Sequence, residues 1–116
     1  MTHPETSPKA HLPLSPAVLA ILLALSSGEK HGYAIMKDAA QPAGGHLTLG
    51  PGTLYGTLDR LVRDALVEET GFTDDTRRRY YRLTSLGLKI FSAEIARLRS
   101  VLHAAQNRAL PRGVRA

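Results

Sequence analysis

The sequence contains no cysteine among its 116 residues, which excludes a disulfide framework and any metal site built on thiolates. It also lacks a long hydrophobic stretch. The longest apolar run, Ala17 to Leu25, has nine residues, whereas a membrane-spanning helix needs about 20. No signal-peptide pattern precedes the first segment with helical periodicity. Together these absences predict a soluble protein of a reducing compartment, and we expect it to be cytoplasmic.

Arrangements of residues that carry catalysis are missing as well. None of the five histidines is three or four residues from another histidine or from a paired carboxylate, so no metal site is expected. Asp74 and Asp75 lie in a polar turn, without the apolar neighbours that raise the pKa of a general acid. The segment Gly50 to Thr53 lacks the lysine and the spacing of a phosphate-binding loop. We therefore expect neither enzymatic activity nor a cofactor.

Basic residues are in excess. The net charge of +5 and the isoelectric point near 10.0 favour a polyanionic partner. Ribosomal proteins, membrane-surface proteins and merely soluble basic proteins share this balance, so charge alone leaves the partner open. A chain of this length most simply forms one domain with a modest core, and a long helix in it has to find its packing partner on another chain.

Two helices are expected in the first half of the chain. Ser15 followed by Pro16 is typical of a helix start, and the nearly all-apolar helix that follows should run to about Ser26 and be covered on most sides. A second helix should open at His31 and run to about Ala40. The alternation of residues 47–49 predicts a very short strand.

The stretch Gly50 to Val67 predicts a third, amphipathic helix. Its apolar stripe consists of Leu54, Leu58, Leu61, Val62 and Ala65. The opposite face carries hydroxyls and guanidiniums that can donate to phosphates and base edges, namely Thr53, Tyr55, Thr57, Arg60 and Arg63. Tyr55 is either a core aromatic or a member of this outer face, and its position one residue beyond Leu54 favours the outer face.

A hairpin should follow this helix, with strands over Leu66 to Phe72 and Arg77 to Leu83. Tyr81 and Leu83 alternate toward Val67, while Arg78, Tyr80 and Arg82 point away. Three consecutive arginines, Arg77, Arg78 and Arg79, lie at the hairpin tip, where they are either a solvated charge run or phosphate contacts. From Pro51 to Lys89 the net charge is only +1. The interpretation as phosphate contacts therefore depends on the clustering of the three arginines and not on net charge.

The last segment has heptad spacing. From Thr84 or Ser85 to about Leu110, apolar residues follow steps of three and four, at Leu88, Phe91, Ile95, Leu98, Leu102, Ala105 and Ala109. A helix of about 26 residues is about 39 Å long, longer than the small domain before it. The overhang predicts a homodimer with contacts at Phe91, Ile95, Leu98, Leu102 and Ala105, whereas Ile90 and Val101 are expected to face the chain's own domain.

The fold expected from these elements is mainly α with a small β-hairpin wing, a winged helix-turn-helix followed by a long C-terminal dimerisation helix. We divide the chain into a flexible arm at residues 1–14, a winged helix-turn-helix domain at 15–84, the dimerisation helix at 85–110 and a basic tail at 111–116.

The chain resembles the PadR-type transcriptional regulators over about Leu14 to Leu110, through the ordered segments LSPAVLAILLAL, HGYAIM, GTLYGTLDRLVRDALVEE and RRRYYRLTSLG. The resemblance implies a homodimer that binds double-stranded DNA and usually represses its promoter, with release by an effector in many members. It implies DNA contacts on the second helix, the third helix and the wing. The residues expected to bind DNA are Tyr33, Thr53, Tyr55, Thr57, Arg60, Arg77, Arg78 and Arg79.

Two positions depart from the family pattern. Gly56 replaces the usual proline after the tyrosine, and Ala65 replaces the common glycine before the strand, which questions a left-handed turn there. Tryptophan is absent, so an aromatic sandwich for flat drugs is not implied. Any effector is expected to be small and apolar or aromatic, between the first and last helices. The alternative function is a winged-helix module that binds another protein and no specific DNA.

Overall fold

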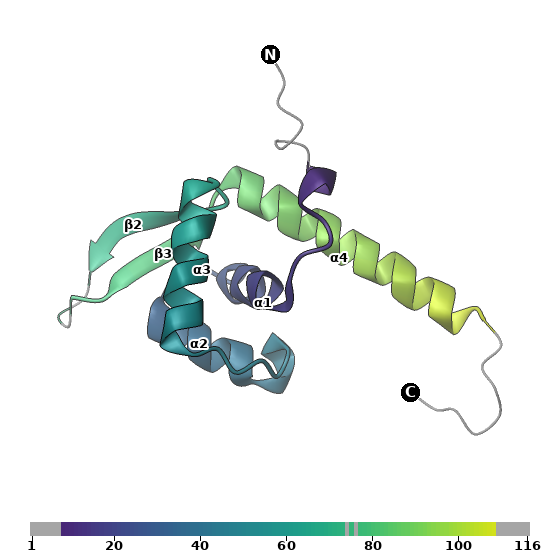
Figure 1. Ribbon diagram of the computed structural model, residues 1–116, viewed down its shortest axis with the longest axis horizontal. Helices are drawn as coiled ribbons and strands as arrows, with labels where there is room; N and C mark the ends of the chain where they lie inside the picture. Colours follow the sequence, from purple (N-terminus) through teal and green to yellow (C-terminus); the bar gives the residue numbers. More distant parts are fainter. Residues whose placement is uncertain (1–7, 74, 76, 109–116) are drawn as a thin grey trace, which may run out of the picture.

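The computed structural model describes residues 8–73, 75 and 77–108, and has the arrangement of a winged helix-turn-helix (Figure 1). In chain order its elements are η2 (Pro8–His11), α1 (Pro16–Leu25), β1 (Lys30–His31), α2 (Gly32–Ala40), η3 (Pro42–Gly44), α3 (Pro51–Arg63), β2 (Val67–Thr73), β3 (Arg79–Leu83) and α4 (Ser85–Gln106). The fold is therefore mainly helical with one small antiparallel sheet, as the sequence predicts.

The core is built around α1, which packs against α2, α3 and α4. Ser15 begins this helix by accepting a hydrogen bond at its hydroxyl from the Val18 amide, 3.2 Å away, and Pro16 occupies the first turn, where its missing N–H costs nothing. Ile21 and Leu22 are completely buried. An almost uniformly apolar helix is thus covered largely by its own chain.

The three strands lie in the order β1-β3-β2, and the wing is the antiparallel pair β2 and β3. Val67 pairs with Leu83, and Tyr81 turns inward and is buried, as expected. The third strand is not where the sequence suggested. Residues 47–49 form no strand, because the Leu47 amide donates instead to the Ala39 carbonyl at the end of α2, and the edge of β3 is occupied by the two-residue strand β1.

The buried stripe of α3 also differs from the prediction. Val62, in the last turn, is 38% exposed, and Ala65 lies beyond the end of the helix. Ala65 adopts a left-handed backbone with φ +64° although it is not glycine. The left-handed turn is therefore present, even though alanine replaces the family's usual glycine there. The Thr84 hydroxyl donates a hydrogen bond of 2.5 Å to the Ala65 carbonyl and holds this turn against the start of α4.

Residues 8–14, directly before α1, are part of the packed structure, contrary to the expectation of a flexible arm over residues 1–14. The helix η2 packs against α4, and Leu12 and Leu14 contact the core. The Leu14 amide donates a 2.9 Å hydrogen bond to the carboxylate of Glu94, which is 1% exposed. A buried carboxylate needs such partners, and this one fixes the segment to α4. Residues 1–7 lie outside the described part of the chain.

Helix α4 runs away from the domain (Figure 1) and ends at Gln106, not at about Leu110. The Asn107 amide caps its C-terminus, and its 22 residues correspond to about 33 Å. Ile90 is fully buried against the chain's own domain, as predicted, but Val101 is 54% exposed because the helix has by then left the domain. Residues 109–116, including Ala109 and the basic tail, lie outside the described residues.

Candidate nucleic-acid interface

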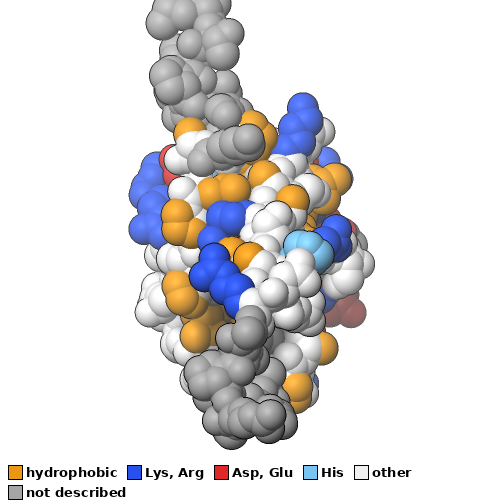
Figure 2. All heavy atoms as spheres, turned by 90° about the vertical axis from the view of Figure 1, so that its right-hand side faces the viewer, with side chains coloured by type: hydrophobic (Ala, Val, Ile, Leu, Met, Phe, Trp, Pro, Cys, Tyr) orange, Lys and Arg blue, Asp and Glu red, His pale blue; other side chains and the backbone are white. Residues whose placement is uncertain are grey.

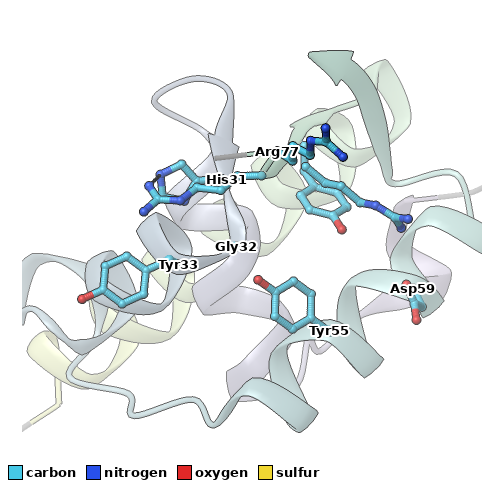
Figure 3. A pocket seen from close by; sticks show the side chains of 9 residues that line it. His31, Gly32, Tyr33, Tyr55, Asp59 and Arg77 are labelled. Atoms are coloured by element: carbon cyan, nitrogen blue, oxygen red, sulfur yellow. Dashed lines mark hydrogen bonds between the residues drawn. The ribbon is translucent and has the colours of Figure 1, made fainter. Parts of the chain in front are cut away.

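A hollow of about 470 Å³ lies where the start of α2, one face of α3 and the wing meet (Figure 3). It is lined by four rings, three arginines, one carboxylate and one glycine, namely His31, Gly32, Tyr33, Tyr55, Asp59, Arg77, Arg78, Arg79 and Tyr81. The antiparallel pairing of β1 with β3, in which His31 lies opposite Tyr80, brings the start of α2 to the wing. The sheet thus joins two segments almost 50 residues apart in sequence.

His31 uses its two ring nitrogens for different neighbours. Nδ1 accepts a 3.1 Å hydrogen bond from the Ala34 amide and so caps α2. Nε2 lies 3.0 Å from Nη1 of Arg78 on the wing. Because Nδ1 acts as an acceptor, the neutral ring carries its proton on Nε2. The structure therefore presents two N–H groups, one from α2 and one from the wing, at the same point.

Aromatic and basic side chains continue from His31 along α2. The Tyr33 ring is stacked with the His31 ring at a centroid distance of 6.5 Å, and Nζ of Lys37 lies 5.6 Å from the centroid of Tyr33. The Tyr80 ring meets His31 edge-on at 5.3 Å. Tyr33 is 53% exposed and points out of the hollow, away from Tyr55 (Figure 3). The rim of the hollow therefore carries open aromatic and cationic groups.

Tyr55 reaches the hollow from the first half of α3. Its side chain is 43% exposed, and its hydroxyl points toward the start of α2 at Gly32 (Figure 3). On the opposite wall Tyr81 is almost fully buried. Burial, with the Glu69 carboxylate nearby, raises the pKa of the Tyr81 hydroxyl from its ordinary value of 10.0, so this group remains a protonated donor at neutral pH.

The wing arginines differ in their partners. Arg79 forms an exposed ion pair of 3.8 Å with Glu69, and Arg82 forms a closer one of 2.6 Å with Glu68, both between the two strands of the wing. Such exposed pairs are weak and exchange readily for another anion. Arg77 has a left-handed backbone, with φ +61°, where the chain enters the wing's second strand. Arg77, Arg78 and Arg79 all line the hollow, and Arg78 contacts the start of α2 through His31.

The structure brings together five of the eight residues expected at a DNA surface, Tyr33, Tyr55, Arg77, Arg78 and Arg79. Thr53 and Arg60 are exposed on α3 outside the hollow. Thr57 does not belong to this surface, because it is only 8% exposed. It lies three residues after Leu54 and four before Leu61, so the helical repeat places it on the buried stripe.

Sequence reasoning missed four residues of this site, His31, Gly32, Asp59 and Tyr81. The position of His31 directly before a helix was a usable signal, since the residue before a helix often caps it. The inward alternation of Tyr81 was recognised, but nothing in sequence showed that the buried ring also borders the hollow. Gly32 and Asp59 belong to the site because of neighbours from distant segments, and no local sequence pattern marks either residue.

Residues 21–93 match the transcriptional regulator PadR-like family. The chain belongs to this family. An uncharacterized 37.1 kDa protein in transposon TN4556 of Streptomyces fradiae is 42% identical over 81 residues, which cover 67% of this chain and 21% of that protein. The PadR-like chain thus spans about a fifth of the length of this curated relative.

Solved structures show the same fold. A PadR family transcription regulator from Clostridium difficile matches with a TM-score of 0.68 at 22% identity, over 79% of this PadR-like chain and 96% of that chain. RosR of H. salinarum matches with a TM-score of 0.63 at 29% identity, over 85% and 84% of the two chains. The family match over residues 21–93 includes α2, α3 and the wing, so all the residues that line the hollow lie in the matched part of the chain.

Two other features are absent from the described residues of this PadR-like regulator. No group of three or more histidine or acidic side chains there is arranged to hold a metal ion. None of the described helices has both the length and the apolar character needed to span a bilayer.

Proposed function

We propose that this PadR-like regulator is a cytoplasmic, sequence-specific DNA-binding repressor that acts as a homodimer on a pseudo-palindromic operator. In this proposal α3 enters the major groove, and the wing and the start of α2 hold the sugar-phosphate backbone. The observation that carries the proposal is the pair of donors from His31 and Arg78, 3.0 Å apart on two different elements beside α3.

The chemistry of that pair favours a phosphate. The Nε2–H of His31 and the guanidinium of Arg78 are both donors, so one acceptor that lies against both groups can bond to each. A phosphate oxygen is such an acceptor, and its charge is further balanced by Arg77 on the same wall of the hollow. Tyr55, whose side chain is 43% exposed, provides another donor from α3 with its hydroxyl.

The exposed side chains of α3 supply the base-reading part of the proposal. Thr53 in the first turn and Arg60 in the third are both open to solvent, and both residue types make base-edge contacts in the major groove. In a two-fold dimer the two α3 helices would contact half-sites about one turn apart, roughly 10 to 10.5 bp, or a multiple of that spacing. Occupation of a promoter by such a dimer would repress transcription.

The exposed apolar side chains of α4 support a dimer. Leu88 and Leu102, two residues of the predicted seam, are 52% and 57% exposed in the single chain, while Phe91, Ile95 and Leu98 between them are half-buried. On the end of the molecule toward which α4 projects, apolar side chains lie open to solvent between basic ones (Figure 2). A second copy of the chain would cover this row.

For an effector we propose a different place from the one expected between the first and last helices. α1 packs directly on α4, whereas a largely apolar recess of about 510 Å³ lies along α4 beside the N-terminal segment. It is lined by Leu12, Ala93, Ala96, Arg97 and Ser100. A small apolar or aromatic compound bound there would regulate DNA binding if it favoured one dimer geometry over the other.

DNA binding is tested by titrating the protein with the duplex upstream of its own coding sequence and with a random duplex, over a salt series. We expect tighter binding to the upstream duplex and a steep loss of affinity between low and moderate salt. Replacing Arg77 and Arg78 with alanine should weaken binding at every salt concentration and reduce the salt slope by about 2, one unit for each lost phosphate contact.

A matched control removes the same charge elsewhere. Arg99 and Arg108 are exposed on or just after α4, away from the wing, so the double alanine variant at these positions should bind with a slope close to that of the parent protein. Equal affinity for the upstream and random duplexes would contradict specific DNA binding, and would favour the alternative of a winged helix that binds a protein. Equal losses in both double variants would contradict the assignment of the wing.

A further inference from the structure

The first residue of α2, Gly32, is buried beneath the side chain of Tyr55. A Cβ atom built on Gly32 would lie 2.7 Å from Cζ and 2.8 Å from Cε1 of the Tyr55 ring, and nearer still to its hydroxyl oxygen. Carbon atoms in contact are normally about 3.5–4.0 Å apart. The ring of Tyr55 therefore occupies the space that any other residue at position 32 would fill.

No other feature of the backbone requires glycine there. Gly32 lies in the first turn of α2, where the chain has no left-handed conformation, and helix interiors generally disfavour glycine by about 1 kcal/mol relative to alanine. The cap of this helix is supplied by the preceding residue, His31. What remains is the close approach of Tyr55, which comes from a different helix 23 residues further along the chain.

We propose that Gly32 is a positioning residue, which seats the hydroxyl of Tyr55 against the start of α2 and so sets the donor that α3 presents to the DNA backbone. This inference rests on the proposed function. Seated in this way, the Tyr55 hydroxyl faces the same hollow as the His31 ring and the wing (Figure 3). One phosphate-binding surface then receives donors from three elements, α2, α3 and the wing.

The neighbours of Tyr55 decide what a larger residue at position 32 does. Because Tyr55 is 43% exposed, its ring can rotate toward solvent when a methyl group takes its place, without opening the core. The Gly32→Ala variant should therefore fold normally, and alanine is also the better helix former. Its defect should be confined to the position of the Tyr55 hydroxyl.

The seating of Tyr55 is tested first in the free protein. Nuclear Overhauser contacts between the Tyr55 ring protons and the Gly32 α-protons are expected in the parent protein, and the corresponding ring contacts to residue 32 should weaken in Gly32→Ala. Absence of these contacts in the parent protein would overturn the inference whether or not the protein binds DNA.

The consequence for binding is tested by a double-mutant cycle with the operator duplex selected in the titration above. Gly32→Ala and Tyr55→Ala should each weaken binding roughly tenfold, as expected for loss of one hydrogen bond to a charged group. The double variant should be no weaker than Tyr55→Ala alone, because Gly32 acts through Tyr55. Thermal unfolding of each variant verifies that the fold is retained.

The outcomes separate the two proposals. Parent-like affinity of Gly32→Ala, or independent losses that multiply in the double variant, would overturn the positioning role while leaving DNA binding intact. Failure of the parent protein to prefer any duplex would overturn the proposed function, and the Overhauser contacts would still decide whether Gly32 seats Tyr55.

Discussion

Single side chains fix the two places where distant segments of this regulator meet. His31 joins α2 to the wing, with its Nδ1 bonded to Ala34 and its Nε2 beside Arg78. Glu94 joins α4 to the segment before α1, with its carboxylate bonded to the Leu14 amide and to Arg97. The sequence position of His31 indicates a helix cap, but the partners through which His31 and Glu94 join distant segments, Arg78 and Leu14, are visible only in the structure.

Glu94 should make the stability of the protein depend on acid. The hydrogen bonds from Arg97, opposed by burial and assisted by the Leu14 amide, lower the pKa of this carboxyl from its ordinary value of 4.5. A lowered pKa in the folded state means that the unfolded state takes up the proton first as pH falls. The stabilisation from Glu94 is therefore fully present above about pH 4.5 and is lost as pH falls through the folded-state pKa.

We expect Glu94→Gln to lower the free energy of unfolding at pH 7 and to flatten the decline of stability below pH 4.5. Urea unfolding from pH 3 to pH 7 measures both effects. Gln is nearly isosteric and keeps an acceptor for the Leu14 amide, so the difference reports the charge. If the free energy of unfolding fell equally steeply below pH 4.5 in the parent protein and in Glu94→Gln, another group would control the loss of stability in acid.

The four helices and the two long strands of the winged helix follow from local pattern, but their ends depend on tertiary contacts. At Ala65 the turn between α3 and β2 is left-handed, a conformation that costs a residue with a Cβ about 1–2 kcal/mol. The Thr84 hydroxyl bonded to the Ala65 carbonyl helps to offset this cost. A substitution that removes the Cβ atom at position 65 should therefore relieve this backbone strain.

Ala65→Gly should therefore raise the free energy of unfolding by about 1 kcal/mol, less a few tenths for the greater freedom of glycine in the unfolded chain. Ala65 is exposed, so no packing is lost. Thermal or urea unfolding measures the gain, with Ala104→Gly in the exposed part of α4 as the control, which should lose stability by about the amount that Ala65→Gly gains. Destabilisation of both variants would show that the turn is not strained.

The accuracy of the sequence-based predictions varied with the range of the interactions involved. The α1 start at Ser15 and Pro16, the inward Tyr81 and the exposed Tyr55 were predictable, because caps and alternation are local. The strand β1 was not, since two residues give no period and only pairing with β3 defines them. Thr57 was misplaced because its hydroxyl suggested the outer face, whereas its spacing from Leu54 and Leu61 assigns it to the buried one.

At the scale of the whole molecule, the domain buries its own core but leaves much of α4 uncovered. From Ser100 onward every described residue of this helix is exposed, and Val101 and Leu102 are both more than half exposed. The predicted seam is thus unevenly covered: Phe91, Ile95 and Leu98 are half-buried in the single chain, whereas Leu88 and Leu102 are more than half exposed. A second copy packed along α4 would bury these exposed side chains and hold the two proposed DNA-binding surfaces at a fixed separation.

This dimer is best tested at positions that the single chain does not use. Leu88 and Leu102 are exposed, lie on the same face of α4, and are 14 residues or about 21 Å apart along the helix. Replacing both with glutamate should leave the folded domain intact and shift the protein from dimer to monomer in sedimentation velocity, because two charges would have to be buried in the interface.

The matched control places two glutamates on exposed positions off the apolar row, at Ser92 and His103, and should remain dimeric. Circular dichroism of both double variants establishes that α4 is retained. If DNA binding requires the two-fold arrangement, the Leu88→Glu, Leu102→Glu protein should also bind a full operator no better than a single half-site, whereas the control should keep its preference for the full operator. A variant that stays dimeric would exclude the α4 row as the interface and require the second copy to dock elsewhere on the domain.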